Sequence, residues 1–151
     1  MKLLPDVERV LVDFLRAQPE LQAELGDRIY TVLPTKPTFP AVRVGRWGGW
    51  AAISRPLVLD EGWCQVDTWG GTKAEASHLA RLMRALIDQR LRASGAPVSA
   101  VRFGMFHDAP DQSYEPARPH WRFDVSLMLR PEAAPPPPVP RELVSPGPPN
   151  P

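Results

Sequence analysis

Residues 63–92 read WCQVDTWGGTKAEASHLARLMRALIDQRLR, a stretch that predicts a strand, a tight turn and a long helix. Positions 63–69 are rich in β-branched and aromatic residues, and the run stops at two glycines, where a turn meets no steric barrier. Thr72 stands three residues before Glu75, the spacing of a capping box in which each side chain bonds the other residue's backbone N–H. The sequence therefore predicts a helix that begins just after Thr72.

Apolar residues recur in this helix at spacings of three and four, and polar residues fall on the opposite side. The apolar stripe comprises Ala76, Leu79, Leu82, Met83, Leu86, Ile87 and Leu91. Arg81, Arg84 and Arg92 lie on the polar side, where they form either a solvated surface or a contact with an acidic neighbour. We expect the apolar stripe to pack on a sheet.

Length and composition favour one domain with a tail. The chain has 151 residues, 43% of them hydrophobic, and a formal net charge of +1, which argues against nucleic-acid binding driven by bulk charge. The single cysteine, Cys64, excludes an internal disulfide, and we expect a small buried strand residue there rather than a nucleophile. No apolar run approaches the roughly 20 residues of a membrane span, so no contact with a membrane is expected.

The rest of the chain supplies further elements of an α+β domain. Helices are predicted at residues 5–17 and 19–25, and strands at residues 27–33, 41–47, 98–106 and 121–129. The last of these strands alternates most regularly and is expected at or near the centre of the sheet. We expect residues 48–62 to form a long loop or ragged hairpin, extended again at 57–59 and turning at 60–62.

The C-terminal residues differ in composition from everything before them. Nine prolines lie in residues 132–151, which cannot form a packed core and favour polyproline II. We therefore divide the chain into a domain at residues 1–131 and an extended proline-rich tail at residues 132–151.

Residue types and spacing predict no catalytic, cofactor or metal site. The three histidines stand apart without an H-x-x-x-H or C-x-x-C partner, and residues 70–73 lack the spacing of a phosphate-binding loop. His107 and Asp108 begin an acidic loop, which we interpret as solvated. A protein with this composition is expected to work by binding.

The order of these segments resembles the tail terminator (tail completion) family of long-tailed bacteriophages over residues 5–130. LGDRIY at residues 25–30, and VDTW at 66–69 followed by an Ala-rich helix, carry the resemblance. It implies a twisted, largely antiparallel sheet of four to five strands, flanked by an N-terminal helix and one long helix, without catalytic residues or cofactors. It also implies a virion protein of the tail or neck, present in the host cytoplasm during assembly.

The resemblance further implies a hexameric ring. Such a ring caps the tail tube, stops polymerisation of the tail-tube protein and joins the tail to the head connector or stopper protein. Genomic DNA passes through its lumen without sequence-specific binding. The main alternative is another neck or tail-tube protein, either a connector adaptor or the tube subunit, and a more distant one is a small enzyme or ligand-binding domain that uses His107, Asp108 and nearby tryptophans.

A closed ring requires contacts between two different faces of each subunit, for which exposed aromatic and arginine residues are expected. The predicted interface comprises Arg46, Trp47, Trp50, Ile53, Arg55, Arg81, Arg84, Arg92, Pro135, Pro138 and Arg141. We expect the proline-rich tail to lie along an adjacent subunit or the next ring.

Overall fold

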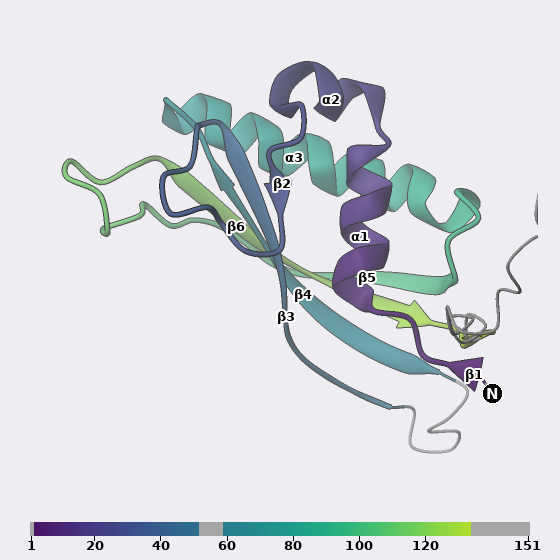
Figure 1. Cartoon of the computed structure of the whole chain (residues 1–151). Helices are drawn as coiled ribbons and strands as arrows, with labels where there is room; N and C mark the ends of the chain where they lie inside the picture. Colours follow the sequence, from purple (N-terminus) through teal and green to yellow (C-terminus); the bar gives the residue numbers. More distant parts are fainter. Residues whose placement is uncertain (1, 52–58, 134–151) are drawn as a thin grey trace, which may run out of the picture.

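A five-stranded sheet with helices on one face forms the body of the protein, as a computed structural model shows (Figure 1). The structure describes residues 2–51 and 59–133. The elements are β1 Lys2–Leu3, α1 Val7–Arg16, α2 Pro19–Leu25, β2 Ile29–Tyr30, β3 Ala41–Ala51, β4 Asp60–Trp69, α3 Lys73–Arg90, a 3-10 turn Leu91–Ala93, β5 Val98–Asp108, β6 His120–Leu129 and β7 Glu132–Ala133. The predicted α+β class, with an N-terminal helix and one long helix, is confirmed.

The strand order is β2-β3-β4-β6-β5, and every pair in it is antiparallel except β2 with β3. The predicted strand 121–129 corresponds to β6, which lies next to the central strand β4. Its predicted alternation is confirmed, because Phe123, Val125 and Leu127 are buried towards the helices. Strand β5 forms one edge of the sheet and the two-residue β2 forms the other.

The unit of β4 and α3 forms for the local reasons that its sequence indicates. The Thr72 side chain accepts from the Glu75 N–H at 3.1 Å and caps the helix. The predicted return bond to Thr72 is wrong, because the Glu75 carboxylate accepts from the Gly71 N–H at 3.3 Å instead. The Thr68 hydroxyl donates to the Ala76 carbonyl at 2.9 Å and so joins the strand to the helix.

Helices α1, α2 and α3 cover one face of the sheet (Figure 1) and bury a single core. Of the predicted stripe on α3, all but Leu82 are buried, and Leu82 packs against the core. Helix α1 is capped by Asp6, whose side chain accepts from the Glu8 N–H at 3.0 Å. Gly26 ends α2 with a φ of 54°, a conformation that favours glycine.

Strands β3 and β4 form a longer hairpin than the sequence predicts. Strand β3 continues through the glycines to Ala51, and β4 already begins at Asp60, so the predicted turn at 60–62 is wrong. Pairing with β4 outweighs the weak strand preference of glycine, and glycine is required at one position. Gly49 has a φ of 130°, and a Cβ there would lie 2.0 Å from the Glu61 carbonyl oxygen.

The predicted strand at residues 27–33 is mostly irregular, because only Ile29 and Tyr30 pair with β3. At the chain ends, β1 and β7 pair as a small second sheet, with Leu3 opposite Glu132. The predicted extended tail lies outside the described residues from position 134 onward. Within the described part of the chain, no helix combines the length and apolarity needed to span a membrane.

Candidate protein interfaces and a buried charge cluster

Arg46 serves as a brace inside its own chain. Its guanidinium donates to both carboxylate oxygens of Asp60, at 2.9 and 3.1 Å, and these bonds raise the pKa of Arg46. Its backbone N–H donates to the Glu8 carboxylate at 2.7 Å, which links β3 to α1. The charge of this predicted interface residue is therefore already paired within the subunit.

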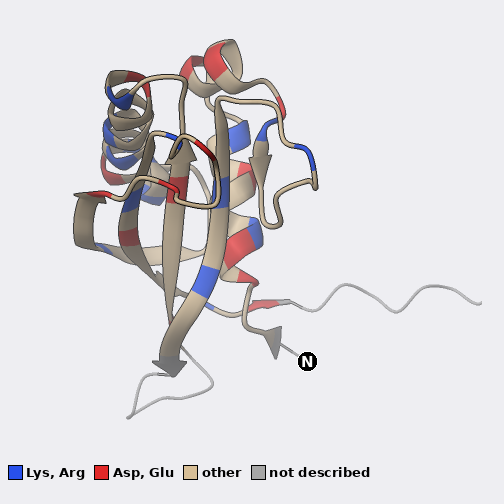
Figure 2. Cartoon of the chain, turned by 90° about the vertical axis from the view of Figure 1, so that its left-hand side faces the viewer, with Lys and Arg blue, Asp and Glu red and all other residues tan. Residues whose placement is uncertain are grey.

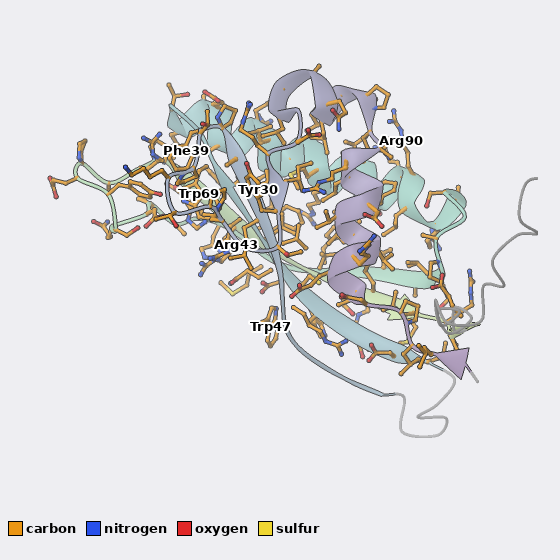
Figure 3. The ribbon with its side chains drawn as sticks, viewed as in Figure 1. Tyr30, Phe39, Arg43, Trp47, Trp69 and Arg90 are labelled. Atoms are coloured by element: carbon orange, nitrogen blue, oxygen red, sulfur yellow. The ribbon has the colours of Figure 1, made fainter. Side chains whose placement is uncertain are left out.

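Trp47 lies on the face of the sheet that no described helix covers, and we call this the uncovered face. Its side chain, labelled in Figure 3, is 59% exposed. Its ring is tilted against that of Trp63, with ring centroids 6.0 Å apart. Of the other predicted interface residues, Trp50 has its backbone in β3. The side chain of Trp50 and the whole of Ile53, Arg55, Pro135, Pro138 and Arg141 lie outside the described part of the chain.

Arg81, Arg84 and Arg92, which we call the arginine ridge, are all exposed along α3 and the 3-10 turn after it. Figure 2 shows basic positions recurring along the turns of α3. The Arg84 guanidinium lies 5.0 Å from the Phe103 ring centroid, on the edge strand β5. Arg81 and Arg92 form no ion pair with any residue that the structure describes. Arg81 and Arg84 line a shallow groove of about 480 Å³ between α3 and β5.

A charge cluster surrounds Asp67, whose side chain is 1% exposed at the other end of the uncovered face. Its Oδ1 accepts from Arg122 Nε at 2.8 Å and contacts His120 Nε2 at 2.7 Å, and its Oδ2 accepts from Arg43 at 2.9 Å. Burial alone would raise the pKa of Asp67, but hydrogen bonds from His120, Arg122 and Arg43 outweigh burial and lower it to about 2. Asp67 is therefore ionised at neutral pH.

The loop 109–119 closes over this cluster and shields it from water. The Trp69 ring stacks on His120 with centroids 4.7 Å apart, and its Nε1 donates to Asp111 at 2.8 Å. His120 Nδ1 contacts the carbonyl oxygen of Ala109. The cluster therefore fixes the loop to the ends of β4 and β6; Trp69 and Arg43 lie side by side there in Figure 3.

The geometry of the cluster suits a structural role better than proton transfer. Both ring nitrogens of His120 face oxygen atoms that accept hydrogen bonds, so neither nitrogen is free for a substrate. Among the described residues, no hydroxyl or thiol bonds to His120. Cys64 is buried, and burial raises the pKa of its thiol to about 12, so the thiol stays protonated at neutral pH.

His107 and Asp108 do not form a shared site. They are consecutive residues of β5, so their side chains point to opposite faces of the sheet. Asp108 pairs with Lys73 at 3.0 Å, and His107 Nδ1 is buried without a partner in the described residues. No group of three or more His, Cys, Asp or Glu side chains that could hold a metal ion occurs within residues 2–51 and 59–133.

The Asp67 cluster has a signal in the sequence that pattern reasoning missed. Asp67 and Arg122 each alternate with buried residues of their strand, a pattern that places both side chains on the face of the sheet away from the helices. Only the register, which pairs Asp67 with Arg122 and with Arg43, brings the charges together. The sequence pattern within one strand does not specify how that strand is aligned with its neighbours.

Comparisons with known proteins agree with this architecture. The family model described as Tail completion protein gp17 matches residues 9–129. No curated protein matches the chain. Eighteen chains of solved structures match, among them a chain of a structure titled "Virion of native gene transfer agent (GTA) particle". That chain is 14% identical with a TM-score of 0.56, and the match covers 84% of this chain and 95% of that one.

Proposed function

The chain belongs to the tail completion protein gp17 family and is therefore a structural protein of a phage-type tail. We propose that it forms a ring that caps the tail tube. In this proposal the ring stops polymerisation of the tube and joins the tail to the head connector or stopper protein. The observation that carries it is the family match over residues 9–129, which spans almost the whole described domain.

Ring formation requires two different faces of each subunit to meet. The arginine ridge beside β5 supplies one face, because Arg81 and Arg92 hold cationic groups without an ion pair among the described residues. The flank formed by α1 carries two exposed acids, Asp13, which lies 3.3 Å from Arg9 of the same helix, and Asp6, which caps that helix. Contact between these flanks would bring opposite charges together, which favours correct docking over other orientations. Six copies close the ring.

The remaining predicted interface residues contact neighbours in the same proposal. Trp47, Trp50, Ile53 and Arg55 lie on or next to the β3–β4 hairpin, which reaches towards the tail-tube protein or the connector. The tail, with Pro135, Pro138 and Arg141, lies along an adjacent subunit or the next ring. Genomic DNA passes through the lumen, and the net charge of +1 favours passage without tight binding.

We further propose that the protein is not an enzyme. The family is a structural one, and the pairing of His120 and the protonation of Cys64 leave neither group ready for catalysis. Replacing His107 and Asp108 by alanine tests the enzyme alternative, because tube capping should survive both substitutions.

Electron microscopy of particles assembled without the protein tests the proposed function. We expect tails of uncontrolled length or tails unattached to heads, because nothing stops the tube. Particles with normal attached tails would overturn the proposal. If the purified protein itself polymerises into tubes, it is a tube subunit and the alternative holds.

A further inference from the structure

The uncovered face carries an aromatic patch near its middle. Trp63 and Gln65 point to this face, because the residues between and after them, Cys64 and Val66, are buried in the core. Trp47 lies at the irregular step of the β3–β4 register, next to Gly48, which pairs with Trp63, and is the more exposed of the two tryptophans. The two indoles therefore form one surface across two strands.

Gly104 on β5 extends this surface across the sheet. A Cβ at Gly104 would lie 3.2 Å from Trp63 Cζ3 and 3.0 Å from Asp124 Cβ. The missing side chain thus lets the Trp63 indole and the Asp124 side chain lie against the backbone of β5. Trp47, Trp63 and Asp124 therefore belong to one stretch of the uncovered face, which we call the tryptophan seat.

Asp124 has no partner in this seat. Its carboxylate makes no hydrogen bond and no ion pair with any described residue, and burial raises its pKa. His107 and Arg122 act on Asp124 only through their charge and form no bond with it, and Arg122 donates to Asp67 at 2.8 Å instead. Arg102 lies 3.7 Å from Glu61 instead. A half-buried carboxylate close to Trp63, on the same face as Trp47, is suited to a guanidinium, which can pair with the acid and stack on a ring.

The chain itself contains a segment with the matching chemistry. Residues 135–141 read PPPPVPR, and Arg141 is the only basic residue in 134–151. Polyproline II segments bind to aromatic-lined grooves because their rings pack on indoles at little entropic cost. We propose that residues 135–141 of a neighbouring copy lie across Trp47 and Trp63 and place Arg141 against Asp124. This inference deepens the proposed function and rests on its ring of subunits.

A neighbouring copy fits this arrangement better than the same chain. Glu132 lines a groove with Asp6 of the α1 cap and with the turn at 94–97, so the last described residues before the segment lie on the helix-covered side of the subunit. The tryptophan seat lies on the opposite side of the sheet. Four consecutive prolines make the segment stiff, which disfavours a sharp reversal around the edge of its own sheet.

Cysteine crosslinking in the full-length protein tests this contact. One chain carries Gln65→Cys and a second carries Val139→Cys; the two are mixed, allowed to assemble and treated with a short bis-maleimide. Native Cys64 stays silent because it is buried. We expect a crosslinked pair of chains, and Trp47→Ala in the first chain should reduce its yield roughly fivefold. Arg141→Asp in the second chain should do the same, and Asp124→Arg in the first should then restore the yield.

The control replaces Gln65→Cys by Asp88→Cys, an exposed position on α3. Equal yield from the control, or a yield unaffected by Trp47→Ala and Arg141→Asp, overturns the docking. The native mass of the same samples shows whether the ring has assembled, and so distinguishes loss of the docking contact from loss of ring assembly. An intact ring without the 65–139 crosslink overturns only the docking, whereas a single-chain mass overturns the ring and the docking together. A crosslink within a doubly substituted chain, without one between chains, overturns the assignment to a neighbouring copy.

Discussion

Asp67 and His120 lie 53 positions apart in the sequence, yet Oδ1 of the first and Nε2 of the second lie 2.7 Å apart in a water-shielded site. Arg122 and Arg43 complete the contacts of the carboxylate. This cluster joins the central strand β4 to β3, to β6 and to the loop 109–119. It is a polar network on a body whose other face is held by apolar packing.

Removing the charge of Asp67 should destabilise the protein strongly. Asp67→Asn leaves the partly buried guanidiniums of Arg122 and Arg43 without their counter-ion, which costs about 3 kcal/mol of unfolding free energy. Urea unfolding followed by tryptophan fluorescence measures this cost. Asp13→Asn, in the exposed pair of Arg9 and Asp13, is the matched control and should cost less than about 1 kcal/mol. An equal loss of unfolding free energy in both variants would show that the Asp67 cluster does not stabilise the fold.

The same cluster sets the stability of the protein in acid. The pKa of Asp67 is lowered from 3.8 to about 2 in the folded state, so the unfolded chain binds the proton more readily. The resulting stabilisation is complete above the unfolded pKa and is lost as the pH falls through 3.8 towards 2. The pKa difference corresponds to about 2 kcal/mol. Urea unfolding between pH 5 and pH 2 should show this slope, and Asp67→Asn should flatten it; an unchanged slope in the variant contradicts the assignment.

Helix α1 packs on β4 where glycine leaves room for it. A Cβ at Gly62 would lie 2.9 Å from Val7 Cγ2, so Gly62→Ala should cost about 1–3 kcal/mol through overpacking. Val7→Ala alone also costs stability, because Val7 is fully buried. Combined in one chain, the two changes should cost less than their sum, since the added methyl occupies the space that valine leaves. Additive costs in chemical denaturation would argue against this contact.

The arginine ridge should matter for assembly rather than folding. Arg81→Ala with Arg92→Ala removes two exposed charges that pair with no described residue, so the unfolding free energy should change by less than about 0.5 kcal/mol per site. Sedimentation velocity should nevertheless show weaker self-association. Arg90→Ala, which breaks the pair with Glu20 inside the subunit, is the control and should leave self-association unchanged. Loss of association only in the control would place the interface elsewhere.

Much of the fold could be predicted because local signals agree with the final structure. The capping Thr72, the apolar stripe of α3 and the alternation in β6 each indicate their element without knowledge of distant residues. The hairpin was predicted too short because its glycines favour a loop, and only pairing with β4 reveals that they extend a strand. The predicted strand at 27–33 is mostly wrong for the opposite reason. Its residues favour a strand, but only Ile29 and Tyr30 pair with β3.

The candidate surfaces were less accessible from the sequence. Arg46 and Trp47 are adjacent in the sequence, and both were expected at an interface. The structure pairs Arg46 with Asp60, whereas Trp47 is exposed. The Asp67 cluster and the tryptophan seat both depend on the register between strands, which spacing within one strand cannot specify. Polar residues on the face of a strand away from the core therefore predict a common surface only when the residues paired with them on neighbouring strands are known.

The mass of the native protein, alone and with tail-tube subunits, tests the central claim most directly. The proposed function predicts a closed oligomer of six chains, and short tubes that stop growing once the protein is added. A single-chain mass under all conditions, with tubes that lengthen as though nothing had been added, would contradict it.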